Sequence, residues 1–150
     1  GGWRRARAIA RGVAANTTLT SIDLGYNGLG AAQATQPNSA LSLAVGTLCQ
    51  AFANNRSLRF VGLAHNALGD SASLAVVQSV LESPTITQLD LHSNHISAEG
   101  LERITGVLRA CGHAWLPSAL NLHAAGAPAL RARAAAAPHA GSLAEVLRAE

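Results

Sequence analysis

The sequence has no lysine and few aromatic residues. All eleven basic residues are arginines, and Phe, Trp and Tyr together make up 3% of the chain. Apolar residues nevertheless reach 49%, which excludes a chain that is disordered by composition. With so few rings, the core must be built from Leu, Val, Ile and Ala. Such side chains favour many small, similar layers over one large core.

Cysteine and long apolar runs are also scarce. Two cysteines, Cys49 and Cys111, do not make a disulfide framework in 150 residues. No apolar run approaches the ~20 residues that span a bilayer, and no secretory signal is recognisable. These absences favour a reducing, cytoplasmic setting. The first residue is Gly rather than Met, so we expect a fragment or a processed product.

Positive charge is concentrated at the start of the chain. Arg4, Arg5, Arg7 and Arg11 fall within the first eleven positions. Basic segments bind nucleic acid or membranes in some proteins. Here no aromatic residues are interleaved with the arginines, and no nucleic-acid motif follows. The interpretation we favour is a solvated helix face, with neither nucleic acid nor membrane as a partner.

Three segments repeat one pattern. They are Leu19–Gly30, Leu58–Gly69 and Ile86–Ser97. Each is aliphatic-x-x-aliphatic-x-Leu-x-x-Asn-x-aliphatic-Gly/Ser, and six matches in three copies are very unlikely to arise by chance. The pattern predicts a short strand followed by a turn in every copy.

Helical patterns lie between these strand segments. Ile9 and Val13 show a weak one, so residues 8–16 are expected to be the helix of a preceding unit whose strand is missing. Together with the strand segments, these helical segments predict that each unit contains a strand, a turn and a helix in that order. Apolar residues recur at spacings of three and four in three clearer helical segments, which contain Val45, Leu48 and Phe52; Leu74, Val77, Val80 and Leu81; and Leu101, Ile104, Val107 and Leu108.

The repeated pattern resembles the leucine-rich repeat, in particular the long ribonuclease-inhibitor type found in intracellular proteins such as NOD-like receptors. Asn66 and Asn94 are 28 residues apart, within the range of that family. Asn27 and Asn66 are 39 apart, so about eleven extra residues are expected near 31–40, ending in a helix cap at Ser39. The resemblance implies an α/β leucine-rich-repeat solenoid: a right-handed αβ horseshoe arc with parallel strands inside and helices outside.

A fourth unit, near residue 117, is degenerate. Leu120 and Leu122 keep the strand pattern, but Pro117 replaces the first aliphatic residue and Ala125 replaces the asparagine. Helices are expected over 129–137 and 142–150, so residues 126–150 are predicted to be a helical tail. Residues 1–18 are predicted to be a helix remnant, and residues 1–150 as a whole to be a single domain fragment.

The resemblance also gives the repeated asparagines a structural role. In the family this side chain is buried and bonds the backbone of neighbouring units, which would make Asn27, Asn66 and Asn94 a ladder. Gly30 and Gly69 follow at turn positions where a positive φ is expected, and Ser97 stands in the third copy.

No catalytic motif is present, so we expect neither an enzyme nor a cofactor nor a small-molecule substrate. Histidine is the one unusual feature. His92 and His123 occupy equivalent positions in neighbouring units, where two imidazoles could meet a metal ion. A zinc site needs three or four ligands. We therefore predict no metal.

The function that the resemblance implies is protein binding on the inner, concave face of the sheet. Two alternatives remain open: a GTPase-activating regulator like the Ran regulator, and a purely structural segment. The partner is expected to be a protein. The candidate contact residues are those that point outward from the strands and turns: Asp23, Tyr26, Phe60, His65, Asp90, His92 and His123.

Overall fold

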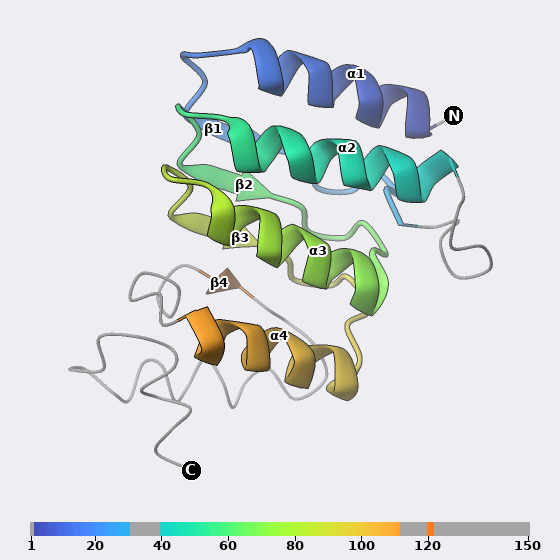
Figure 1. The fold of residues 1–150 in the computed structure, drawn as a ribbon. Coiled ribbons are helices and arrows are strands. Elements are labelled where there is room, and N and C mark those ends of the chain that lie inside the picture. The colour runs from blue at the N-terminus through green and yellow to red at the C-terminus, as the bar shows by residue number, and fades with distance from the viewer. Residues whose placement is uncertain (1, 31–39, 112–119, 122–150) are drawn as a thin grey trace.

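The computed structural model describes residues 2–30, 40–111 and 120–121 of the chain. In these residues helices alternate with short strands (Figure 1), as the repeated pattern predicts. The mixed α/β class is therefore confirmed. In chain order the elements are α1 (Gly2–Ala15), β1 (Ser21–Asp23), α2 (Ala40–Asn54), β2 (Phe60–Gly62), α3 (Gly69–Glu82), β3 (Gln88–Asp90), α4 (Ala98–Cys111) and β4 (Leu120–Asn121).

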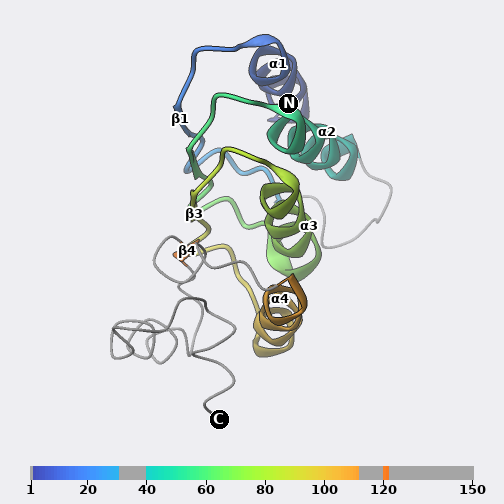
Figure 2. The same ribbon diagram turned by 60° about the vertical axis from the view of Figure 1, so that its left-hand side comes forward.

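The strands form one parallel sheet in the order β1-β2-β3-β4. Ser21 pairs with Phe60, and Phe60 pairs with Gln88, so equivalent positions of successive units lie side by side. The helices form a second layer on one side of the sheet (Figure 2). Parallel strands require a crossover connection, and the helices supply it.

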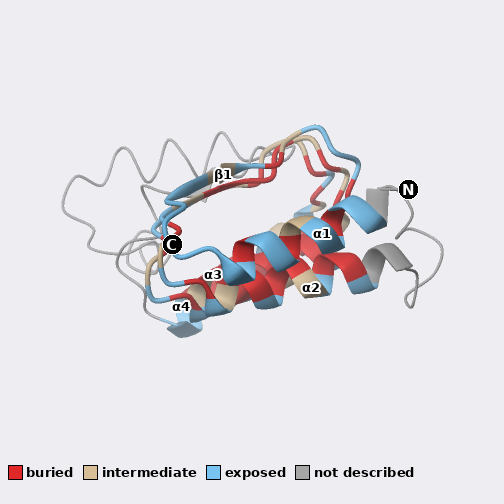
Figure 3. Cartoon of the chain, turned by 90° about the horizontal axis from the view of Figure 1, so that it is seen from above, coloured by how far each residue is buried: buried red, intermediate tan, exposed pale blue. Residues whose placement is uncertain are grey.

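The core lies between the two layers, where the buried residues gather (Figure 3). Leu24, Leu63 and Leu91 directly follow the paired strand residues, and they are 7%, 1% and 0% exposed. Phe52 of α2 and Val77 of α3 belong to the same buried cluster. The leucines of the three copies therefore share one buried cluster with the helices, and this apolar burial joins the two layers.

The first helix lies within the helix remnant predicted for residues 1–18. It begins at Gly2, whereas the apolar spacing alone indicated a start near residue 8. Ala6 and Ala10 are each 1% exposed and pack with Val13 in the layer that α1 shares with α2 (Figure 1). The contact between α1 and α2 thus depends on small alanine side chains, which the spacing of large apolar residues does not reveal. In the described parts of the chain, no helix combines the length and hydropathy that a bilayer crossing demands.

Part of the fourth unit can be described. Leu120 and Asn121 pair with Leu89 and Asp90, so the degenerate copy adds a strand where it was predicted. Several other expectations lie outside the described residues: the extra segment at 31–39 with its cap, Pro117, Leu122, His123 and Ala125, and the helices expected at 129–137 and 142–150.

Candidate binding face

The candidate binding face is the side of the sheet opposite the helices, with the turns that follow the strands. We call it the strand face. On β1, Ser21 and Asp23 are exposed, while Ile22 between them is partly buried. This alternation follows from the pleat of a strand, which directs successive side chains to opposite sides.

Three rings from three successive units touch one another on the turns. Tyr26 stacks on His65, with ring centroids 4.2 Å apart and planes inclined by 10°. His65 meets His92 in an edge-to-face arrangement at 4.8 Å and 87°. We call these residues the ring row. Tyr26, at its end, is 78% exposed. The structure thus brings together three of the predicted contact residues.

The backbone of the turns fixes this row. Tyr26, His65 and Ser93 hold equivalent positions and have φ values of 59°, 54° and 55°. A left-handed conformation is costly for residues other than glycine, so it persists only where surrounding bonds impose it. Here the N–H of Tyr26 donates to the carbonyl of Ala64 at 3.0 Å, and that of His65 to the carbonyl of His92 at 3.1 Å. The rings are therefore presented by turns that are bonded to the next unit.

Two carboxylates flank a glycine beside the ring row. Asp23 lies opposite Gly62, which in turn lies opposite Asp90. The Oδ1 atom of Asp90 is 2.7 Å from Nδ1 of His92 and accepts the N–H of His92 at 3.1 Å. The Oδ1 atom of Asp23 accepts the N–H of Gly25 at 2.9 Å. These bonds hold both carboxylates in place and put hydrogen-bond acceptors next to the rings.

Phe60 is partly buried, not exposed as predicted. Gly62, two residues further on, explains the difference. A Cβ atom at Gly62 would lie 3.2 Å from Cε1 of Phe60, so the ring leans over the space that the missing side chain leaves. Ala64, two residues beyond Gly62, is only 8% exposed. Phe60 therefore forms part of the floor of the strand face, and Tyr26 is its projecting ring.

Buried asparagines tie the units together behind this face. The Nδ2 atom of Asn66 donates to the carbonyl of Leu24 at 2.8 Å, one unit back, and its Oδ1 accepts the N–H of Asn27 at 2.9 Å. Asn94 makes the same bonds one unit later, to the carbonyl of Leu63 at 2.8 Å and from the N–H of Asn66 at 3.0 Å. Asn66 and Asn94 are 0% and 1% exposed.

Comparisons with known proteins agree with this repeating geometry. A family model described as a leucine-rich repeat matches residues 15–32 and 82–104, which hold the first and third copies of the pattern. Over these two segments the chain is similar to leucine-rich repeats. The search of curated proteins found no match. A solved structure titled leiomodin-1 actin-binding site 2 matches with a TM-score of 0.62 and 14% identity, over 97% of this chain and 74% of that chain. At that identity the likeness concerns the fold.

The asparagine of the first repeat departs from the buried position that the resemblance implied. Asn27 is exposed, and its Nδ2 donates to the carbonyls of Leu24 and Gly25, within its own repeat, at 2.9 and 3.0 Å. Strand β1 is at the edge of the described sheet, so no described repeat covers Asn27 from the other side. Burial of this asparagine depends on a neighbour, not on the motif alone.

A second polar row joins each helix to the next strand, and the sequence reasoning missed it. Asn16, Asn55 and Ser83 hold equivalent positions. Each accepts, through its side-chain oxygen, the N–H of the residue three positions later, at 2.6, 2.7 and 3.3 Å respectively. Nδ2 of Asn55 also donates to the carbonyl of Val13 in the preceding layer at 2.8 Å. The sequence does carry a signal for this row, because each of its polar residues stands three positions before the first aliphatic residue of its copy of the motif.

The turn glycines are needed for different reasons. Gly69 has the expected positive φ, of 72°, whereas Gly30 does not lie in the left-handed region. Gly30 is needed because a Cβ atom there would lie 2.0 Å from the carbonyl oxygen of Ala67 in the next repeat. The first two repeats thus approach each other by direct backbone contact.

A serine replaces this glycine in the third repeat and makes a polar contact instead. The N–H of Ser97 donates to Oδ1 of Asp70 at 2.7 Å, and its hydroxyl donates to Oδ2 at 2.5 Å. These bonds lower the pKa of the Asp70 carboxyl, and the charge of Arg103 adds to the effect. Gly100 leaves room for this carboxylate, since a Cβ atom there would lie 2.3 Å from Oδ1 of Asp70.

His92 and His123 are the two histidines whose equivalent positions could have brought them to one metal ion. His92 bonds Asp90, while His123 lies outside the described residues. Over the part of the chain that the structure describes, no three His, Cys, Asp or Glu side chains gather as a metal site requires. Nothing in the arrangement assigns a metal to the strand face.

Proposed function

We propose that the chain is a non-enzymatic module that binds a protein partner through its strand face. The observation that carries this proposal is Tyr26, whose ring is 78% exposed although it stacks on His65. Aromatic anchors are enriched at protein interfaces, and a ring held on a bonded turn loses little entropy on binding. Asp23, Asp90 and His92 would supply a polar rim.

We further infer that the repeats build a right-handed arc of the ribonuclease-inhibitor type, with the strand face on its inner, concave side. In favour of this subtype, 28 residues separate Asn66 from Asn94, and the strands are parallel and in register with helices on one side. A cytoplasmic location belongs to this proposal, by resemblance to intracellular proteins with such repeats.

Photocrosslinking tests the face directly. A benzoylphenylalanine placed at Tyr26 should form a discrete adduct with a partner protein in cells, to be identified by mass spectrometry. The matched control places the same group at Gln78, an exposed residue of α3. Adducts of equal yield and identity from both positions would contradict the proposal, because contact would then not be confined to the strand face.

The identified partner then allows an affinity test. Tyr26→Ala should weaken binding by about 2 kcal/mol, as expected for an aromatic anchor, and leave the thermal midpoint nearly unchanged. Glu102→Ala and Arg103→Ala, on the outside of α4, should change neither quantity. Phe60→Ala should lower both binding and stability, because Phe60 is partly buried. Equal affinity for all four variants would move the site off the strand face.

Actin is the first purified protein to test, because the leiomodin-1 structure is named for actin binding. At 14% identity this likeness bears on the fold, so actin enters as a probe and not as the inferred partner. Cosedimentation that is lost on Tyr26→Ala would identify it as a partner.

A further inference from the structure

Asn27 is followed by a glycine, whereas the asparagines at the same place in the other two copies are not. Ala67 follows Asn66, and His95 follows Asn94. The carboxamide of an asparagine is attacked most readily by the backbone nitrogen of a following glycine, because no Cβ atom obstructs the approach. The sequence of the first turn therefore allows a reaction that the second and third turns hinder.

The structure adds exposure to this difference. Asn27 and Gly28 are both exposed, while Asn66 and Asn94 are 0% and 1% exposed. A Cβ atom at Gly28 would meet nothing within 4 Å, so the space beside its backbone nitrogen is open. Water, which completes the reaction, can therefore reach the carboxamide of the first copy but not those of the two buried asparagines.

The attacking nitrogen is not held by a hydrogen bond. The N–H groups of Asn27 and Leu29 both donate to Oδ1 of Asn66, at 2.9 and 3.3 Å. The N–H of Gly28, between them, donates to no residue that the structure describes. Nδ2 of Asn27 donates to two carbonyls of its own turn, whereas Nδ2 of Asn66 donates to three carbonyls in two repeats. The carboxamide of Asn27 therefore has fewer bonds to release before its Cγ atom can turn to the nitrogen of Gly28.

We infer that Asn27 is a site of spontaneous deamidation, set apart from the buried asparagines of the ladder by its exposure and by Gly28. The backbone nitrogen of Gly28 loses its proton and bonds Cγ of Asn27, the bond from Cγ to Nδ2 breaks, and ammonia leaves with the proton. Water then opens the cyclic imide at one of its two carbonyls. The products are aspartate, with the main chain as before, and isoaspartate, with the main chain running through Cγ.

Each product alters the first turn. A carboxylate at position 27 has no N–H to donate to the carbonyls of Leu24 and Gly25, which lie 2.9 and 3.0 Å from Nδ2 in the unmodified chain. Isoaspartate also adds one atom to the main chain between the two N–H groups that share Oδ1 of Asn66. The isoaspartate product should therefore loosen the contact between the first two repeats.

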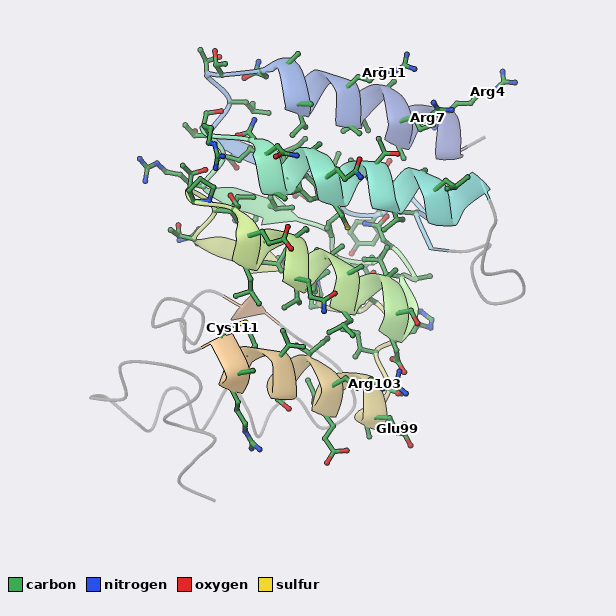
Figure 4. The ribbon with its side chains drawn as sticks, viewed as in Figure 1. Arg4, Arg7, Arg11, Glu99, Arg103 and Cys111 are labelled. Atoms are coloured by element: carbon green, nitrogen blue, oxygen red, sulfur yellow. The ribbon has the colours of Figure 1, made fainter. Side chains whose placement is uncertain are left out.

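Both products place a new negative charge in the strand layer. The formal net charge of the chain, +3, falls by one. The new carboxylate lies directly after Tyr26, on the turn that follows β1, so its formation can be followed by charge as well as by mass. The charged side chains labelled in Figure 4 belong instead to the helix layer, namely Arg4, Arg7 and Arg11 on α1 and Glu99 and Arg103 on α4.

The first test needs no substitution. The full chain is incubated at physiological temperature and mildly alkaline pH, and tandem mass spectrometry measures the deamidated fraction at Asn27, Asn66 and Asn94 over several weeks. Asn27 should react faster than either buried asparagine by about tenfold or more. Its rate should rise with pH, because the attacking nitrogen must lose a proton. Equal rates at the three positions would overturn the inference.

Two matched variants separate the effect of the glycine from that of burial. Gly28→Ala gives the first turn the pair found in the second, where Ala67 adopts the same left-handed conformation with a φ of 51°. It should slow the reaction at Asn27 by about tenfold or more. Ala67→Gly gives the second turn the pair found in the first, and Asn66 should still react slowly because it is buried.

Denaturant provides the control for burial. In the unfolded Ala67→Gly chain, Asn27 and Asn66 should react at similar rates, since both are then exposed and followed by glycine. If Asn66 of the folded variant already reacts as fast as Asn27, the rate depends on sequence alone and the role of exposure is wrong. An unchanged rate at Asn27 in Gly28→Ala would show that the glycine is not required.

A last measurement concerns the products. Aged chain is separated from fresh chain by ion exchange, and the isoaspartate fraction should unfold at a lower denaturant midpoint. Amide shifts in NMR should be confined to the first turn and its contacts with Asn66. Unchanged shifts at Asn66 would contradict the predicted loosening. None of these measurements involves a partner protein, so this inference and binding through the strand face can fail separately.

Discussion

The Nδ2 atom of Asn66 donates to the carbonyl of Leu24, 42 residues earlier, at 2.8 Å. Its side chain also bonds Leu63 and Asn27 in a fully buried position. Asn66→Ala should therefore destabilise the chain by about 1–3 kcal/mol, since the partner groups would be left buried and unpaired. Denaturant unfolding measures the difference.

Asn27→Ala is the matched control, because Asn27 holds the same place in the motif but is exposed. We expect it to cost less than about 1 kcal/mol, since water can replace its bonds. Equal losses for the two substitutions would mean that the ladder does not derive its strength from burial.

A pair of glycine substitutions should act in opposite directions. Gly30→Ala places a Cβ atom 2.0 Å from the carbonyl oxygen of Ala67, a backbone atom that cannot move freely, and should cost about 1–3 kcal/mol. Gly12→Ala, in α1, meets nothing within 4 Å and should stabilise the helix by about 0.5–1 kcal/mol. Thermal unfolding midpoints show whether each substitution lowers or raises stability. A Gly30→Ala chain as stable as the unsubstituted one would show that the first two repeats are not in close contact.

Asp70 should make stability depend on pH in the acid range. The bonds from Ser97 lower the pKa of its carboxyl in the folded state below the ordinary value of 3.8. Its contribution is therefore complete above the unfolded pKa and is lost as the pH falls through the folded one. Denaturant midpoints at pH 5, 4 and 3 should fall less steeply for Asp70→Asn than for the unsubstituted chain. Glu102→Gln, which removes an exposed carboxylate from α4, should keep the original slope.

The two thiols should differ sharply in reactivity. Burial raises the pKa of Cys49 to about 11, whereas Cys111 is exposed at the end of α4. Since the thiolate is the nucleophile, iodoacetamide at about pH 8 should alkylate Cys111 rapidly and spare Cys49 until denaturant is added. Peptide mass spectrometry reads the two sites separately. Equal native rates would place Cys49 outside the core.

The sequence predicted the layers well because their residues repeat. Leu24, Leu63 and Leu91 recur at one motif position, and the structure buries all three in the same cluster. Of the apolar residues predicted for α3 and α4, Val77, Val80, Ile104 and Leu108 are buried, and the other four are partly buried. Periodic burial leaves a periodic signal, so these elements could be found without coordinates.

What the sequence did not predict depends on neighbours. Phe60 is partly buried because Gly62 leaves space beside it, and Asn27 is exposed because β1 is an edge strand of the described sheet. The stack of Tyr26 on His65 needs two turns with positive φ to lie side by side. A motif specifies its own residues, whereas these features arise between motifs. The apolar spacing placed the start of α1 too late for a different reason, the small size of Ala6 and Ala10.

The bonds of the buried asparagines run from each repeat to the one before it, as from Asn94 to Leu63 and from Asn66 to Leu24. A pull applied to the two ends of such an array loads these links in series, so the weakest boundary between repeats yields first. Under tension the chain should lengthen in steps of about one repeat, and the order of the steps should follow the number of links at each boundary. The asparagine bonds that stabilise the folded chain at rest would thus also make it unfold one repeat at a time under tension.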